Sequence, residues 1–211
     1  MDHAIENSGR GARGEALPDY ATRASIFAKL NSPEPVDRET AWKEFFARYG
    51  PVIVAFAKRC GAGRQDINDI VQDVMASFFA VSGEFEYDPK LGRFRGWLKT
   101  CTVRAAVRRA GKNLRFQGVP LDERTDVQAA AEPIWQDVWE RELFARALTV
   151  LRQTAGDGVP FRAFEQYVLL DRPAQDVAQE LNTSVDNVHQ AKSRMTTRLR
   201  EIVRRLRSED E

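Results

Sequence analysis

The spacing of the apolar residues most constrains the fold of this chain. From about Asp37 onward they recur in steps of three and four, as in the stripe formed by Ile67, Ile70, Val74 and Phe78. Such steps place side chains on one face of a helix with 3.6 residues per turn. Alternating runs of Val, Ile and Thr bounded by hairpin turns, the pattern of strands, do not occur. The sequence therefore predicts an all-α fold.

Two helical regions are separated by a stretch of different character. Residues 116–134 carry a glycine, prolines, several acids and a short alanine run, a composition typical of a linker. The pattern predicts two small helical domains, over 21–115 and 135–207, joined by a flexible linker over 116–134. Residues 1–20 are rich in glycine, alanine and charge without periodicity, which predicts a flexible tail. The predicted helices cover 37–49, 51–61, 66–81, 94–114, 135–155, 161–170, 173–181 and 185–207.

Composition excludes several classes of protein. Hydrophobic residues make up 43% of the chain, enough to bury a core. No apolar run approaches the roughly 20 residues that a membrane span needs, and the polar N-terminus does not resemble a signal peptide. The two cysteines and two histidines are isolated, so neither a disulfide framework nor a zinc site is indicated. We expect a cytoplasmic protein without a cofactor, a bound metal or a membrane partner.

The C-terminal segment has the pattern of a DNA-binding helix-turn-helix. A short helix from Pro173 is followed by a turn at Asn182, a residue that tolerates left-handed angles, and by a long helix from Val185. Thr183 or Ser184 can cap that helix. Seven basic residues against two acidic ones suit phosphates, although a basic helix exposed to solvent has the same composition. The candidate residues for duplex DNA are Ser184, Asp186, Asn187, His189, Gln190, Lys192, Ser193, Arg194 and Arg198.

A second basic segment lies in the N-terminal half. Between Arg93 and Arg115 there are eight basic residues and no acidic one, and Phe94 and Trp97 stand near its start. Cations that follow a backbone and rings that stack on bases suit single-stranded DNA. The alternative is that the aromatic residues belong to the core, which we favour for Phe94 and leave open for Trp97. The candidate residues for melted DNA are Trp97, Lys99, Arg104, Arg108, Arg109 and Lys112.

The predicted helix before it has an acidic polar face, with Asp66, Asp69, Gln72 and Asp73. Asp69 and Asp73 are four residues apart and so are neighbours. Three roles are open: a solvated surface, a carboxylate metal site and a docking face for a partner. Helical di-metal sites use Glu-x-x-His pairs, and neither histidine stands in one. The residues alone favour the solvated surface.

Three segments resemble the extracytoplasmic-function sigma factors of bacterial RNA polymerase. DINDIVQDV at 66–74 is similar to the DAEDLVQEV block of sigma region 2, and FEYDPKLGRFRGWLKT at 85–100 resembles the segment that follows it. The segment 177–203 resembles the helix-turn-helix of region 4. The resemblance covers about residues 21–207, with the segments in the family's order.

The resemblance implies a role for each segment. The face with Asp66, Asp69, Gln72 and Asp73 is expected to dock on core RNA polymerase. The basic-aromatic helix is expected to bind the melted −10 promoter element, and the C-terminal domain the −35 element as duplex. An anti-sigma factor is a further partner that the family allows. Arg104, Asn182 and Lys192 depart from the usual Asn, Gly and Leu, which bears on the promoter that is read.

Two other classes of function are alternatives to the sigma factor interpretation. An autonomous helix-turn-helix regulator would bind an operator without polymerase, but the acidic and basic-aromatic helices have no clear task in it. A helical enzyme is the third class. The sequence offers no nucleophile and base pair, phosphate-binding loop or metal cluster, so we expect a protein that is not an enzyme.

Overall fold

The structure is a computed structural model of the 211-residue chain, and it describes residues 23–30, 32–82, 94–111, 114–116, 119–120 and 126–210. The predicted N-terminal tail, 1–20, lies outside these residues. The elements are α1 (Arg23–Leu30), α2 (Pro35–Arg59), α3 (Arg64–Ser82), α4 (Phe94–Ala110), β1 (Arg115–Phe116), β2 (Val119–Pro120), α5 (Val127–Ala155), α6 (Val159–Phe164), the π-helical turn η3 (Glu165–Leu169), α7 (Ala174–Glu180) and α8 (Val185–Asp210).

The all-α prediction is confirmed. Among the described residues, the one exception is an antiparallel ladder of two residues per strand, in which Arg115 pairs with Pro120 and Phe116 with Val119. Within the same residues, every helix is too short or too polar to cross a bilayer.

Aromatic rings form the centre of the N-terminal core, which α1 to α4 enclose. The rings of Phe45 on α2 and Phe78 on α3 stack with centroids 4.0 Å apart, and Phe94 on α4 meets each of them edge-on at 6.0 Å. Phe94 is 2% exposed, so the prediction of a core role for it is confirmed. Phe46 and Phe79, neighbours of these core residues in sequence, lie at the surface.

Helix α2 is continuous where the sequence predicted a break at Gly50 and Pro51. Proline inside a helix removes one backbone hydrogen bond and costs about 3 kcal/mol or more. Residues on both sides of Pro51, among them Phe45, Tyr49 and Ile53, are buried in the same core, while Pro51 itself is exposed. Burial of one uninterrupted face outweighs the local cost, so a proline that was expected to start a helix lies within one.

Two other helix ends differ by a few residues from the prediction. Helix α3 begins at Arg64 rather than at Asp66, so Asp66 lies in its first turn. Helix α4 ends at Ala110 rather than near Leu114, because Gly111 takes a positive φ of 43° that turns the chain away.

Helix α5 begins inside the segment that was predicted to be a linker. The side chain of Asp126 caps it by accepting hydrogen bonds from the backbone N–H groups of Gln128 and Ala129. Ala131 and Ile134 are buried in the N-terminal core, which explains why the helix forms earlier than 135. Part of the remaining predicted linker lies outside the described residues, and the division of the chain into two domains stays a prediction.

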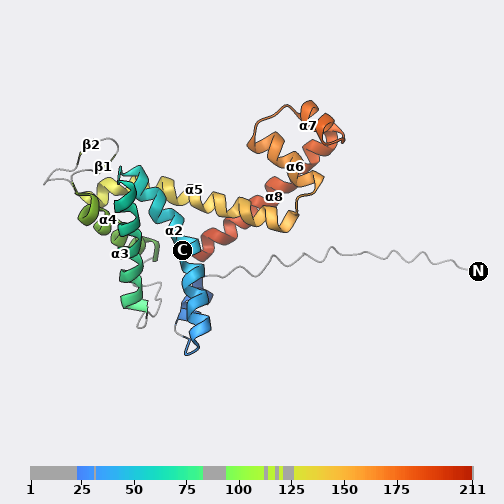
Figure 1. Cartoon of the computed structure of the whole chain (residues 1–211). Coiled ribbons are helices and arrows are strands. Elements are labelled where there is room, and N and C mark those ends of the chain that lie inside the picture. Colours follow the sequence, from blue (N-terminus) through green and yellow to red (C-terminus); the bar gives the residue numbers. More distant parts are fainter. Residues whose placement is uncertain are drawn as a thin grey trace, which may run out of the picture.

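The same helix reaches a second core. Figure 1 shows α5 running from the group of α2, α3 and α4 to α6 and α7, with α8 beside it. Its first half packs Trp135 and Trp139 into the N-terminal core, and its second half packs Leu143 and Leu151 against α6 and α8. Phe144, next to Leu143 on the same helix, is 44% exposed.

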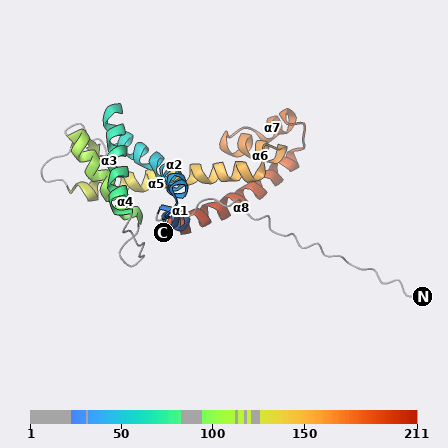
Figure 2. The same ribbon diagram turned by 60° about the horizontal axis from the view of Figure 1, so that its bottom comes forward.

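The C-terminal end of α8 returns to the N-terminal part of the chain (Figure 2). Arg48 on α2 and Glu209 on α8 form an ion pair with an N–O distance of 3.3 Å. Their side chains are only 8% and 12% exposed. Nearby, Arg207 on α8 pairs with Glu140 on α5 at 2.6 Å. These contacts join the C-terminal end of α8 to α2 and α5.

Candidate nucleic-acid interface

The acidic residues of α3 differ in how far they reach solvent. Gln72 is exposed, Asp66 and Asp69 are partly buried, and the Asp73 side chain is 16% exposed. All four stand on the helix that carries Ile70, Val74 and Phe78 into the core, so the core fixes their direction. The spacing predicted correctly that these residues lie on one helix. It did not indicate that Asp69 and Asp73 form ion pairs with residues of another helix.

Asp73 is bound by two arginines from α4. Its carboxylate accepts hydrogen bonds from Nε and Nη2 of Arg109, at 2.6 and 2.7 Å. Nη2 of Arg108 lies 2.7 Å from Oδ2 of the same carboxylate, and Nη1 of Arg109 lies 3.8 Å from Asp69. These contacts, the Arg109 hydrogen bonds above all, hold the pKa of the Asp73 carboxyl far below its ordinary value. Two sets of residues that were predicted to serve different partners therefore contact each other.

The other candidate residues on α4 differ in their exposure to solvent and in their partners. Arg104 is exposed, whereas Lys99 forms an ion pair with Glu132 at the start of α5. Trp97 is partly buried against the rings of Phe78 and Phe94, with centroids 5.7 and 5.6 Å apart. Its ring therefore packs on the core while part of it stays accessible. Lys112 lies outside the described residues.

The C-terminal region has the geometry that its sequence predicted. Helix α7 and helix α8 are separated by a short turn in which Asn182 takes a φ of 49°, in the left-handed region. Ser184, and not Thr183, caps α8, since its Oγ accepts the backbone N–H of Asn187 at 3.1 Å. All nine candidate residues stand on or just before α8, and all are exposed except Arg198, which is partly buried.

Tyr167 is a residue that the sequence analysis missed. It lies in η3, and its ring stacks on the ring of His189 with centroids 5.5 Å apart. Nζ of Lys192 lies 5.1 Å from the same ring, a cation–π contact. Tyr167 thus contacts two of the candidate DNA-binding residues on α8, His189 and Lys192. No local pattern could have indicated this, because the contact crosses the turn between helices.

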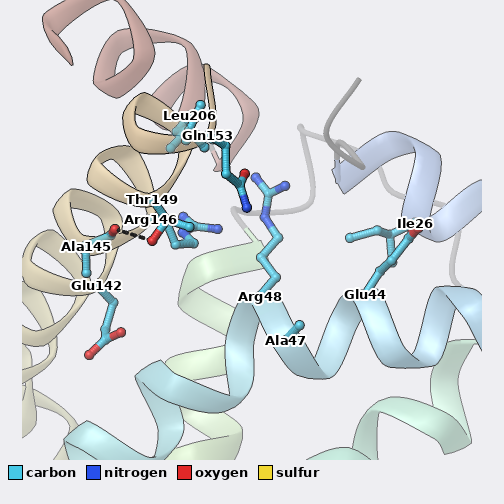
Figure 3. A pocket seen from close by; sticks show the side chains of 11 residues that line it. Ile26, Glu44, Ala47, Arg48, Glu142, Ala145, Arg146, Thr149, Gln153 and Leu206 are labelled. Carbon is cyan, nitrogen blue, oxygen red and sulfur yellow. Dashed lines mark hydrogen bonds between the residues drawn. The ribbon is translucent and has the colours of Figure 1, made fainter. Parts of the chain in front are cut away.

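A cavity of about 580 Å³ lies at the junction of α1, α2, α5 and α8. Figure 3 shows Arg48 extending from α2 toward Arg146 and Gln153 on α5. The lining mixes charges of both signs with apolar side chains such as Ile26 and Leu206. Within the described part of the chain, no group of three or more His, Cys, Asp or Glu side chains is arranged to hold a metal ion.

Comparison with known proteins gives one family match. Residues 45–116 match the model of sigma-70 region 2. A solved structure, described as CnrH in complex with the cytosolic domain of CnrY, covers 84% of this chain and 94% of that chain at 17% identity, with a TM-score of 0.34. A likeness at that level supports no inference. No curated protein matches the chain. Residues 45–116, from the middle of α2 to β1, are therefore similar to sigma-70 region 2.

Proposed function

We propose that this protein is a sigma factor of the extracytoplasmic-function type. In this role it binds core RNA polymerase in the cytoplasm and directs promoter recognition and transcription initiation. The observation that carries the proposal is the region 2 match, which spans both the acidic face of α3 and the basic-aromatic helix α4. In this proposal the chain selects the promoter, while core polymerase catalyses RNA synthesis.

Helix α3 provides the polymerase contact in this proposal. Asp66, Asp69 and Gln72 lie on one helix that the core holds rigid, and each reaches solvent at least in part. An acidic surface on a rigid helix suits a basic or polar partner, because opposite charges steer the encounter and fix the register.

Helix α4 provides the contact with the melted −10 element. The exposed Arg104 and the 60% exposed Arg108 can follow a phosphate backbone, and the accessible part of Trp97 can meet a base. Unstacking a base costs a few kcal/mol, which is least for strands that are already open. The proposal therefore assigns α4 to promoter DNA opened together with the polymerase.

Helices α7 and α8 provide the contact with the −35 element. The first turns of α8 expose Asp186, Asn187, His189 and Gln190, where base edges are read in a major groove. The exposed Lys192 and Arg194 follow within the next turn and suit phosphates. Because both DNA contacts stand on one chain, each raises the effective concentration of the other. An anti-sigma factor is a further partner that only the resemblance of the sequence suggests.

Charge reversal on α3 tests the polymerase contact. We expect the Asp69→Arg variant to lose co-elution with purified core polymerase, because it places a cation where the partner is expected to be basic or polar. Its matched control is Glu201→Arg, which reverses an exposed acid on α8. Circular dichroism checks that both variants remain folded. Equal retention of Asp69→Arg and the wild-type chain on core polymerase would remove α3 from the interface.

The helix-turn-helix geometry also fits a second function, that of an autonomous transcriptional regulator. Such a protein binds its operator without polymerase, commonly as a dimer with half-sites about one helical turn apart. Gel-shift measurements with and without core polymerase distinguish the two. A sigma factor requires polymerase for tight, specific binding, whereas a regulator binds equally well in its absence.

A further inference from the structure

The ion-pair group formed by Asp69, Asp73, Arg108 and Arg109 is arranged with its carboxylates inward and its cations outward. Asp73 is 16% exposed and Arg108 is 60% exposed, the lowest and highest values in the group. The four formal charges cancel, but the positive end faces solvent. That orientation suits a polyanion better than it suits a basic partner.

The two arginines use their guanidinium groups differently. Arg109 turns Nε and Nη2 toward Asp73 and Nη1 toward Asp69, so all three of its nitrogens face carboxylates. Arg108 brings only Nη2 to Asp73. Its Nε and Nη1 have no acidic partner among the described residues. These N–H groups point to different sides of the guanidinium, and either can donate a hydrogen bond to a phosphate oxygen.

Asp73 also restrains the direction of Arg108. Neighbouring residues on a helix diverge by about 100° around its axis, so Arg108 and Arg109 would ordinarily point apart. Here both converge on one carboxylate of the adjacent helix. A side chain that is already fixed loses less conformational freedom when it binds a ligand.

We propose that Asp73 is a positioning residue for nucleic acid, which aims the remaining N–H groups of Arg108 at a phosphate of the melted strand, and not a polymerase contact. The inference rests on the proposed function for the identity of that DNA. It leaves Asp66, Asp69 and Gln72 as the polymerase-facing residues of α3, and it makes Arg109 the link that joins α3 and α4.

The Asp73→Asn variant distinguishes the positioning role from a purely electrostatic effect, because the two predict opposite changes in DNA affinity. Removal of a negative charge near DNA alone strengthens binding. Loss of the side chain that aims Arg108 weakens it, by roughly threefold to tenfold near physiological salt. It also lowers the slope of log K against log salt by roughly 0.7, the value for one phosphate contact on single-stranded DNA.

The experiment measures a fluorescent forked promoter fragment with the polymerase complex, and a single-stranded oligonucleotide with the free chain. Arg108→Ala is expected to reproduce the slope of Asp73→Asn, and the double variant is expected to be no weaker than Arg108→Ala alone. Asp73→Glu, which keeps the carboxylate, is expected to restore most of the slope. Core polymerase affinity is expected to stay unchanged in all of them.

Several outcomes would overturn the inference. Tighter DNA binding by Asp73→Asn, an unchanged slope together with a lower melting temperature, or additive effects in the double variant would each exclude positioning. Lost polymerase affinity with intact DNA binding would return Asp73 to the polymerase contact. If the wild-type chain fails to bind polymerase, the proposed function fails, while the oligonucleotide titration still tests Asp73. No salt-dependent binding to either probe would refute positioning as well.

Discussion

The carboxylate of Asp73 shows how a single side chain can link two helices that are distant in sequence. Its partners on α4 lie 35 and 36 residues further along the chain, in a different helix. The sequence identified every member of this group as charged and helical. It could not indicate that they pair, because a salt bridge between helices depends on how the helices pack.

The pairing makes part of the stability depend on pH. The arginines lower the pKa of Asp73 in the folded chain, so its stabilising contribution is complete above the ordinary pKa near 4 and is lost as the pH falls through the lowered value. We expect Asp73→Asn to reduce the melting temperature by about 2–4 °C at neutral pH. That difference from wild type is expected to shrink below about pH 4. Calorimetry measures it from about pH 3, roughly one unit below the ordinary pKa, up to about pH 7.

The control for this series is Gln72→Ala, which alters the same face without a titratable group. Its difference from wild type is expected to stay constant across the pH range. A difference for Asp73→Asn that did not change with pH would contradict the ion-pair account.

Cys60 gives a second prediction at the scale of one residue. Burial raises the pKa of its thiol to about 12, and burial also raises the pKa of Cys101. Because the thiolate is the reactive form, Cys60 is expected to resist a thiol-specific dye in the native chain near pH 8 and to react fully in urea. A Cys101→Ser background isolates it. Rapid labelling of the native variant would show that α2 does not pack as described.

At the scale of elements, the periodic pattern located the helices but misplaced several of their ends. The helix-turn-helix was predictable because its turn has a local signature, with Asn182 in the left-handed region and Ser184 as the cap. The continuity of α2 was not predictable, because the local preference of Pro51 to start a helix is opposed by burial of residues on both sides of it.

This difference in α2 can be tested. In a continuous helix, Pro51→Ala restores a backbone hydrogen bond, although it also frees the unfolded chain. We expect the net effect to stabilise the protein by about 2 kcal/mol, the helix gain less the cost in the unfolded state. Urea denaturation measures it. A variant that is less stable than wild type would indicate that Pro51 begins a separate helix, as the sequence alone suggested.

At the scale of the whole molecule, the structure contains contacts that no local pattern encodes. Arg48 and Glu209 are 161 residues apart, yet they form an ion pair from which solvent is largely excluded. Helix α5 packs in both cores, in part over residues where the composition suggested a linker. The sequence thus predicted the parts of the molecule better than the contacts between them.

The Arg48–Glu209 pair predicts what holds the C-terminal end of α8 against α2. Glu209→Ala removes a largely buried carboxylate that pairs with Arg48 on α2 and with Arg205 on its own helix, which destabilises the folded chain. We expect a lower melting temperature and a larger radius of gyration in small-angle X-ray scattering. Glu201→Ala, an exposed position on the same helix, is the control and is expected to change neither. Identical scattering for Glu209→Ala and wild type would show that the pair does not hold α8 against α2.

We propose that this chain directs core RNA polymerase to promoters. The most direct test is run-off transcription from genomic fragments with purified core RNA polymerase, in the presence and absence of the chain. The account predicts discrete transcripts from a small set of fragments only when the chain is present, and their loss with Asp69→Arg. Core polymerase that produces the same transcripts with and without the chain would contradict it.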